Sequence, residues 1–400
     1  MSSTSLSGAM RRNVSLLAFS QAAVMTSISL VLASSVVIGV DLATPALATL
    51  PLAFQYLGTM LALYPLARLI VRFGHKPVFI GGALIGALGL SLAALAIQQR
   101  SFPLFTLSGG LVGVFSAVGQ YYRFAAVEAV TSELRGKAIS LTLSGGVLAA
   151  FVGPNLARST RDMLGQPFAA SFLALAVVAL IAAVLANALR LRHRPATTEA
   201  LSRPPFILLF RQPEFLLAVV SGVLGYTLMN LLMTATPLAM MCNRLGFAET
   251  ATVIQWHVVA MFAPSFFTGS LIQRFGMLPV MFVGGISTMA SIGVAINGES
   301  LQHFEWALVL LGIGWNFLYI GATARLVECC PAEQKAGVQA VNDSLVFLSI
   351  AIVTFSAGGL VDRYGWVMLN FYSAIPLSLL LAAIAWQWLS ERRIPRPSRA

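Results

Sequence analysis

The chain has 400 residues, of which 58% are hydrophobic and only 10% are charged, and its mean hydropathy is +0.84. Soluble domains carry about 25% charged residues, so this composition excludes an ordinary soluble protein. A net charge of +11 would suggest nucleic acid in a soluble chain, but here the basic residues are confined to the ends of the long apolar runs and to the loops between them. We therefore expect a lipid bilayer as the surroundings and no nucleic-acid partner.

Twelve apolar segments follow one another along the chain, each near the length of about 20 residues that a membrane-spanning helix needs. They are continuously apolar and do not alternate, which excludes a transmembrane β-barrel and predicts an all-α integral membrane protein. The expected segments are 14–39, 47–69, 77–97, 103–127, 137–157, 168–189, 214–241, 250–272, 279–296, 304–328, 336–360 and 366–388.

A basic, proline-rich stretch at 190–213 separates the sixth segment from the seventh. We interpret it as a cytoplasmic linker between an N-terminal six-helix bundle (1–189) and a C-terminal six-helix bundle (214–400). With both termini in the cytoplasm, only five of the 25 Lys and Arg residues fall on the other side, as the positive-inside rule requires. The sequence thus predicts a multi-pass protein of the bacterial inner (cell) membrane.

An internal repeat indicates that the two bundles are related, because several residues recur at one offset of 202 positions. The recurring residues are Arg72-Phe73-Gly74 with Pro77, Gly82 and Arg123, and Arg274-Phe275-Gly276 with Pro279, Gly284 and Arg325. The run from Ala67 to Lys76 resembles the loop motif that follows the second helix in the major facilitator superfamily, with Val71 in place of the usual acidic residue. This resemblance implies twelve helices in two pseudo-symmetric six-helix bundles, secondary transport, and a substrate site between the halves near the midplane.

The sequence shows no sign of an enzyme. A nucleotide-binding loop of the Gly-x-x-x-x-Gly-Lys-Ser/Thr kind is absent, so ATP is not expected to drive transport. No Ser/His/Asp set or pair of carboxylates stands out as catalytic.

The most informative chemical signal is a set of metal ligands at helical spacing. Met229 and Met233 lie four residues apart in the seventh segment, and His257 and Met261 lie four apart in the eighth. Residues four apart share a helix face, and the helical rise puts the two pairs at matching depths. Thioether and imidazole ligands suit copper, especially Cu(I). If the two helices face each other, the four side chains form two pairs of copper ligands, one above the other. The alternative is that the methionines only fill the hydrophobic core.

The Met-x-x-x-Met and His-x-x-x-Met motifs in these two segments resemble the CcoA-type copper importers (the CalT family). The resemblance implies that Met229, Met233, His257 and Met261 are copper ligands. It also implies copper import into the cytoplasm, supply of copper for assembly of cbb-type haem–copper cytochrome oxidase, and cytoplasmic copper-handling proteins as partners. Copper is then the transported substrate, and no resident cofactor is expected.

Smaller features add three secondary candidates, the first of which has an interfacial turn as its alternative. They are Met240, Met241 and Cys242 for receiving the metal at the outer mouth; Cys329 and Cys330 for metal release or redox sensing at the inner end; and Asp343 for coupling to a proton or cation.

Two other functions stay open. Gly153-Pro154 in the fifth segment is similar to a motif of exporters, and the largely apolar, aromatic interior suits a major facilitator carrier or exporter of an organic solute or drug. A membrane sensor or scaffold that binds copper without moving it is the third hypothesis.

Overall fold

Helices make up all the regular secondary structure in the residues that the computed structural model describes, which are 8–131, 134–191, 212–330 and 335–393. The all-α prediction is confirmed. The elements are α1 (Gly8–Leu42), the 3-10 turn η1 (Pro45–Leu47), α2 (Leu50–Phe73), α3 (His75–Gln98), α4 (Phe102–Glu128), α5 (Arg135–Leu143), α6 (Gly145–Thr160), α7 (Ala169–Asn187), α9 (Pro213–Cys242), α10 (Phe247–Phe262), α11 (Ser265–Phe275), α12 (Met277–Ile296), α13 (Leu301–Glu328) and α14 (Lys335–Arg393).

Ten helical stretches in this part of the chain are long and apolar enough to cross a membrane. The last of them, Val341–Arg392, has 52 residues, and at 1.5 Å per residue its length of about 78 Å suffices for two crossings. The pair α10 and α11, with 16 and 11 residues, supplies one more, interrupted at Pro264. Proline lacks the N–H that a continuous helix needs there. The described residues therefore form the twelve membrane helices that the sequence predicts.

Three glycines make the sharp turns between membrane helices. Gly74 joins α2 to α3 at φ 83°, and Gly276 joins α11 to α12 at φ 90°. Gly365 bends α14 at φ 74°, which divides it into two membrane helices. Side chains strongly disfavour such positive φ values, so glycine is needed at each turn. The glycine of the repeated sequence motif thus has the same structural role in both halves.

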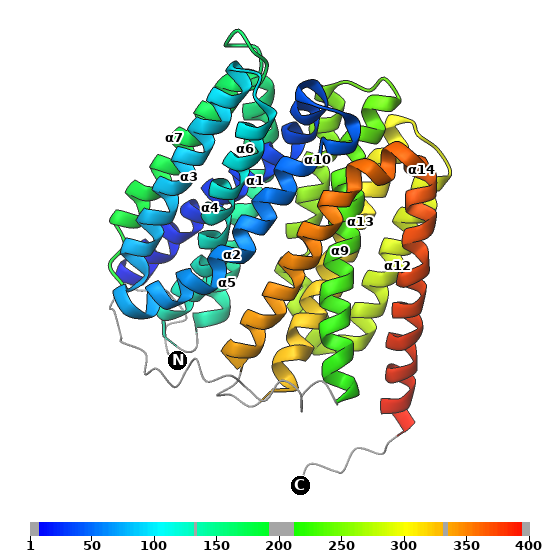
Figure 1. Ribbon diagram of the computed structural model, residues 1–400. Helices are drawn as coiled ribbons and strands as arrows, with labels where there is room; N and C mark the ends of the chain where they lie inside the picture. Colours follow the sequence, from blue (N-terminus) through cyan, green and yellow to red (C-terminus); the bar gives the residue numbers. More distant parts are fainter. Residues whose placement is uncertain (1–7, 132–133, 192–211, 331–334, 394–400) are drawn as a thin grey trace.

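The helices pack in two groups (Figure 1). In the first, α1 packs on α4, α6 and α7, and α3 packs on α4 and α7; in the second, α13 packs on α9, α10 and α12. The groups meet where α2 lies against α14, α6 against α10, and α1 against α9 and α10. The expected linker at 190–213 falls almost wholly outside the described residues, so the domain boundaries stay a prediction.

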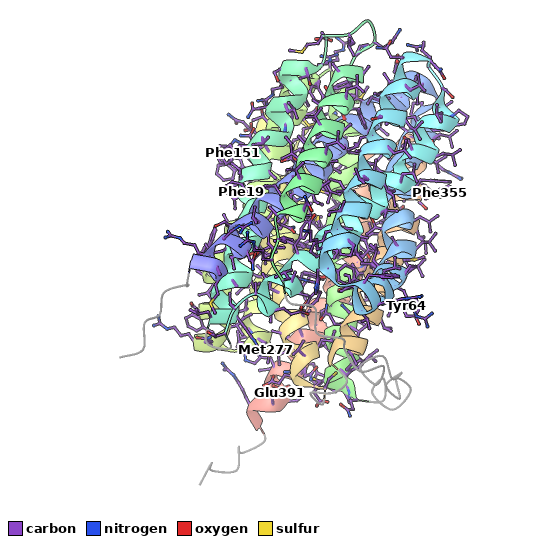
Figure 2. The ribbon with its side chains drawn as sticks, turned by 90° about the vertical axis from the view of Figure 1, so that its left-hand side faces the viewer. Phe19, Tyr64, Phe151, Met277, Phe355 and Glu391 are labelled. Atoms are coloured by element: carbon purple, nitrogen blue, oxygen red, sulfur yellow. The ribbon has the colours of Figure 1, made fainter. Side chains whose placement is uncertain are left out.

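We call the end of the bundle where α1 begins and α14 ends the termini end, and the opposite end the far end (Figure 1). Many large apolar side chains are exposed around the sides, among them Phe19, Phe151 and Phe355 at 57, 41 and 59% (Figure 2). A soluble protein rarely exposes so much apolar surface. Lipid chains cover such a surface without cost, which agrees with a membrane protein.

Candidate functional site

An ion pair joins the two groups of helices near the termini end. Arg123 Nη2 of α4 lies 3.3 Å from Asp343 Oδ2 of α14. Asp343 Oδ1 accepts hydrogen bonds from Gln339 Nε2 at 2.8 Å and from Tyr319 OH at 3.5 Å. Among the described residues, Asp343 is the only buried Asp or Glu. An ionisable residue inside a membrane protein is a functional candidate by default.

A buried amide joins the same groups nearer the far end. Asn230 of α9 donates from Nδ2 to Tyr56 OH of α2 at 2.8 Å, and its Oδ1 accepts from Thr354 Oγ1 of α14 at 2.7 Å. The backbone N–H of Gly358 also donates to Thr49 Oγ1, at 3.2 Å. Asn230 therefore ties together three helices from both groups.

The far end is closed by a third set of contacts, between α6–α7 and α10. Arg158 donates to the Ala248 carbonyl oxygen at 2.7 Å and also to Thr252 Oγ1. The rings of Phe168 and Phe247 meet edge to face, with centroids 4.7 Å apart. These contacts hold the two groups of helices together at this end.

Five aromatic side chains lie about halfway along the membrane helices, between the Asp343 contacts and the contacts at the far end. We call them the aromatic cluster; its members are Tyr226 of α9, Phe262 of α10, Trp315 and Tyr319 of α13, and Phe347 of α14. Trp315 stacks on Tyr319 with centroids 5.3 Å apart and planes at 12°. Tyr226 meets both rings edge to face, at 5.2 and 5.1 Å. Such stacked and edge-to-face geometries are the favourable ones for aromatic rings.

The aromatic cluster faces the other group of helices. Tyr226 lies one helical turn before Asn230, so both share the face that meets α2. A Cβ on Gly146 of α6 would lie 3.0 Å from the Phe262 ring, which shows how closely that ring approaches the first group. Tyr319 also connects the cluster to Asp343 through its hydroxyl. Aromatic walls beside a few convergent polar groups are typical of sites for small organic molecules.

The four expected copper ligands, Met229, Met233, His257 and Met261, are all buried. His257 Nδ1 lies 2.7 Å from the Leu308 carbonyl oxygen of α13, and its Nε2 is buried without a hydrogen-bond partner. However, α10 packs chiefly on α13 and α6, while α9 packs chiefly on α13 and α14, and the direct contact between α9 and α10 is slight. The convergence of the four side chains on one ion stays a prediction.

The secondary metal candidates lie at helix ends. Met240 is buried, Met241 is half-buried and Cys242 is exposed at the last turn of α9. At the end of α13, Cys330 is buried and Cys329 is half-buried. Burial raises the pKa of the Cys329 thiol, against the opposing effect of Arg325. The expected release or redox role of the two cysteines stays a prediction.

Within the described residues, no three His, Cys, Asp or Glu side chains come together as a metal site. The Met and His hypothesis rests on thioether and imidazole ligands and stays a prediction. Sequence reasoning found Asp343 but missed Arg123 as its partner and missed the aromatic cluster. The sequence signal that could have indicated the aromatic cluster is the spacing of four residues between Tyr226 and Asn230 and between Trp315 and Tyr319.

Comparison with known proteins agrees with the fold. The profile of the Major Facilitator Superfamily matches residues 15–293. The riboflavin transporter RfnT of Brucella anthropi is 39% identical over 381 residues, which cover 94% of this chain and 96% of that protein. Two uncharacterized MFS-type transporters of Bacillus subtilis, YdeG and YddS, are 28% and 27% identical; the matches cover 86% and 85% of this chain and 84% and 82% of those proteins.

One of these relatives is named for an organic substrate, riboflavin, and the other two are named for no substrate. They therefore favour the organic-solute alternative over copper, which the sequence motifs had put first. They support the fold class and the expectation of transport, and they make the chain a multi-pass membrane transporter and not an enzyme. The chain belongs to the Major Facilitator Superfamily.

Proposed function

We propose that this protein carries riboflavin, or a planar heteroaromatic solute of similar chemistry, across the membrane as a secondary transporter. The observation that supports this most is the aromatic cluster at mid-height, on the face where the two groups of helices meet. The similarity to a riboflavin transporter over nearly the whole chain points to the same substrate class. The solute-carrier alternative of the sequence analysis is thereby preferred to copper import.

The chemistry of the cluster suits such a solute. Riboflavin has three fused, nearly planar rings, and aromatic side chains bind such rings by stacking and edge contacts worth about 0.5–1.5 kcal/mol for each pair. Trp315 Nε1 is buried without a hydrogen-bond partner, so it offers a donor to a ring carbonyl. The hydroxyl-rich side chain of riboflavin needs polar partners, and Asn230, Tyr56 and Thr354 lie on the same face.

Transport in this proposal follows from the rocking of the two halves around a central site. Asp343 is the coupling residue: a proton on its carboxyl group removes the charge that attracts Arg123. The other titratable groups around it are Tyr121 of α4, Tyr226 of α9 and Tyr319 of α13. Because Tyr319 belongs to the aromatic cluster and also donates to Asp343, a solute that displaces Tyr319 alters the surroundings of the carboxylate.

The orientation in this proposal has both termini in the cytoplasm of a bacterial cell, supported by the distribution of Lys and Arg. The termini end is then the cytoplasmic end, and Asp343 lies nearer to it than the aromatic cluster does.

Copper import is the second candidate, and one observation favours it. His257 is fully buried, and its Nε2 lacks a partner. A buried polar atom without a hydrogen bond costs about 1–3 kcal/mol, which a bound ion with Met229, Met233 and Met261 would relieve.

Binding by the purified protein separates the two candidates. Riboflavin fluoresces, and stacking against Trp315 and Tyr319 is expected to quench that emission. We expect quenching by wild type that saturates with riboflavin, weaker binding of the three-ring nucleus without its polyol chain, and no competition by ribitol alone or by Cu(I). Tight Cu(I) binding without any flavin quenching would favour copper import over flavin transport.

A further inference from the structure

The Arg123–Asp343 ion pair lies directly beside the aromatic cluster. Tyr319 stacks on Trp315, and its hydroxyl donates to Asp343 Oδ1 at 3.5 Å. Arg123 Nη2 lies 3.3 Å from the other oxygen of the same carboxylate. The pair is accessible, because 24% of the Arg123 side chain and 12% of the Asp343 side chain are exposed. A solute ring stacked at Trp315 would therefore have the ion pair within reach of its substituents.

Arg123 has hydrogen-bonding capacity that Asp343 does not use. A guanidinium group has five N–H donors. Among the described contacts of Arg123, Nη2 bonds to Asp343, while Nε is buried without a hydrogen-bond partner. Free guanidinium donors bind phosphate oxygens well, often two at a time. The Asp343 carboxylate prevents this here, because it neutralises the arginine and repels a second anion.

The aromatic cluster has no other charged group close to it within the described part of the chain. Arg123 and Asp343 are the charged groups near enough to act electrostatically on Tyr226 and Tyr319. Another arginine at the interface, Arg158, bonds to the first turns of α10 at the far end, whereas α10 contributes its last residue to the cluster. The surroundings of the cluster are therefore neutral as long as Asp343 pairs with Arg123.

We propose that Asp343 is a specificity-determining residue, which makes the site accept an uncharged flavin and reject a flavin that carries a phosphate on its polyol chain. This inference rests on the proposed function. A phosphate group adds about −1.5 to −2 charges at neutral pH. Toward the far end it finds the neutral groups of Asn230, Tyr56 and Thr354. Toward the termini end it meets the carboxylate of Asp343. Without an unpaired cation on either side, the phosphate would lose its water uncompensated.

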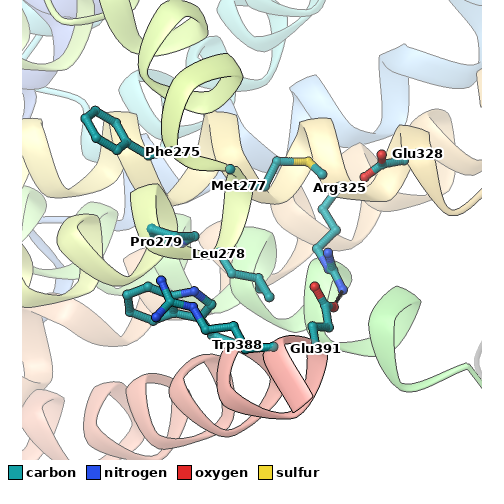
Figure 3. A pocket seen from close by; sticks show the side chains of 10 residues that line it. Phe275, Met277, Leu278, Pro279, Arg325, Glu328, Trp388 and Glu391 are labelled. Carbon is teal, nitrogen blue, oxygen red and sulfur yellow. Dashed lines mark hydrogen bonds and ion pairs between the residues drawn. The ribbon is translucent and has the colours of Figure 1, made fainter. Parts of the chain in front are cut away.

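The internal repeat supplies a matched control for this proposal. Arg325, the counterpart of Arg123, pairs with Glu391 in a pocket of about 580 Å³ that is lined by residues of the second group of helices (Figure 3). Glu391→Gln therefore releases an arginine, as Asp343→Asn does, but in a pocket that contains no member of the aromatic cluster. The comparison separates a released arginine beside the cluster from a released arginine elsewhere.

The test titrates the purified full-length protein with three flavins that differ only at the end of the polyol chain, and follows quenching of their fluorescence. They are riboflavin and the phosphate and acetyl esters of its terminal hydroxyl. The acetyl ester adds bulk without charge. For wild type we expect the acetyl ester to bind like riboflavin. The phosphate ester should bind at least about tenfold more weakly, because a charged group buried without a hydrogen-bond partner costs at least that factor.

Three variants locate the effect, and the readout is the Kd of the phosphate ester divided by the Kd of riboflavin. Any loss of affinity that both flavins share cancels in this ratio. Asp343→Asn should lower the ratio by about 10- to 150-fold, the range that hydrogen bonds to a charged group give. Adding Arg123→Gln to Asp343→Asn should restore the wild-type ratio, and Glu391→Gln alone should leave it unchanged.

The possible failures are distinguishable. Equal binding of riboflavin and its phosphate ester by wild type, rejection of the acetyl ester as strong as that of the phosphate ester, or an unchanged ratio in Asp343→Asn would each overturn the role of Asp343 and leave the flavin carrier standing. A wild-type protein that binds none of the three flavins would overturn both proposals. The comparison of the three flavins needs wild type alone, so it separates charge from size even where a variant fails to fold.

Discussion

Arg123 pairs with Asp343 across the two groups of helices, over a separation of 220 residues in the sequence. Its counterpart in the repeat, Arg325, pairs instead with Glu391 inside its own group. The position that corresponds to Asp343 in the first half is Leu141, which has no charge. The repeat therefore preserves the arginine and not its partner, and only one of the two arginines bridges the halves.

Asp343→Asn should uncouple transport from the proton gradient. The amide keeps the size and hydrogen-bonding capacity of the carboxyl group but cannot take up a proton. We expect solute exchange across the membrane to continue while accumulation driven by a pH difference falls at least about tenfold, the loss that corresponds to 1.4 kcal/mol. The measurement is uptake into proteoliposomes with and without an imposed pH difference.

Arg325→Gln is the matched control for this prediction, because it removes the repeat-related arginine away from the interface between the halves. It should retain uptake that responds to the pH difference. If Asp343→Asn accumulated solute as well as wild type, Asp343 would be a structural partner of Arg123 and the coupling would lie elsewhere.

Trp315→Ala should weaken binding of the flavin. The substitution removes the ring that stacks on Tyr319 and against which the flavin is expected to stack. Stacking of a heteroaromatic ring on an aromatic side chain contributes about 1–3 kcal/mol. Flavin titration should show an apparent Kd raised by about 5- to 150-fold. Trp386→Ala is the control, because Trp386 is 76% exposed on the lipid-facing surface. Equal losses in the two variants would exclude the aromatic cluster as the binding site.

Asn230→Leu should destabilise the protein. The change leaves the hydroxyls of Tyr56 and Thr354 without their buried partner, and each unsatisfied group costs about 1–3 kcal/mol. We expect a lower Tm in thermal unfolding of the purified protein. Asn297→Leu, which alters an exposed amide that bonds only its own helix, should leave the Tm nearly unchanged. A Tm unaffected by Asn230→Leu would mean that this bond contributes nothing to the association of the two halves.

Gly74→Ala should also lower the Tm, by a separate mechanism. Gly74 adopts φ 83° and ψ 171°, a conformation that costs other residues about 1–3 kcal/mol. Gly81→Ala in α3 is the control, because a Cβ there meets nothing within 4 Å. Alanine favours a helix over glycine by about 1 kcal/mol, so the control should be neutral or slightly stabilising. A Gly74→Ala variant as stable as wild type would contradict the structural role assigned to the repeated motif.

The fold was predictable because a long, continuously apolar segment crosses a bilayer as an α-helix, in which every backbone polar group is paired. The twelve segments and the turns at Gly74 and Gly276 follow from composition and from residues that recur at a fixed offset. Composition does not specify how each helix is rotated about its own axis. The expected copper site requires side chains of α10 and α9 to converge. α10 lies mainly against α13, where Gly312 lets the backbone at His257 approach closely, and convergence of the four side chains stays a prediction.

The candidate site was predictable only in part, for the same reason. Asp343 stood out because a carboxylate within an apolar run is conspicuous. Arg123 lies on a helix far away in sequence, and no local pattern links the two. Trp315 and Tyr226 look like ordinary apolar residues of a helix interior until the packing of α9 and α13 brings their rings against Tyr319.

The central claim is that the transported solute is a flavin-like molecule and not a metal ion, and transport by wild type tests it most directly. Proteoliposomes containing the purified protein would be given riboflavin and Cu(I) in parallel, with empty liposomes as the blank. The account predicts riboflavin uptake that saturates and is lost in Trp315→Ala, with copper uptake no higher than in the blank. Copper uptake that is lost in His257→Leu, together with riboflavin uptake at the level of the blank, would contradict it.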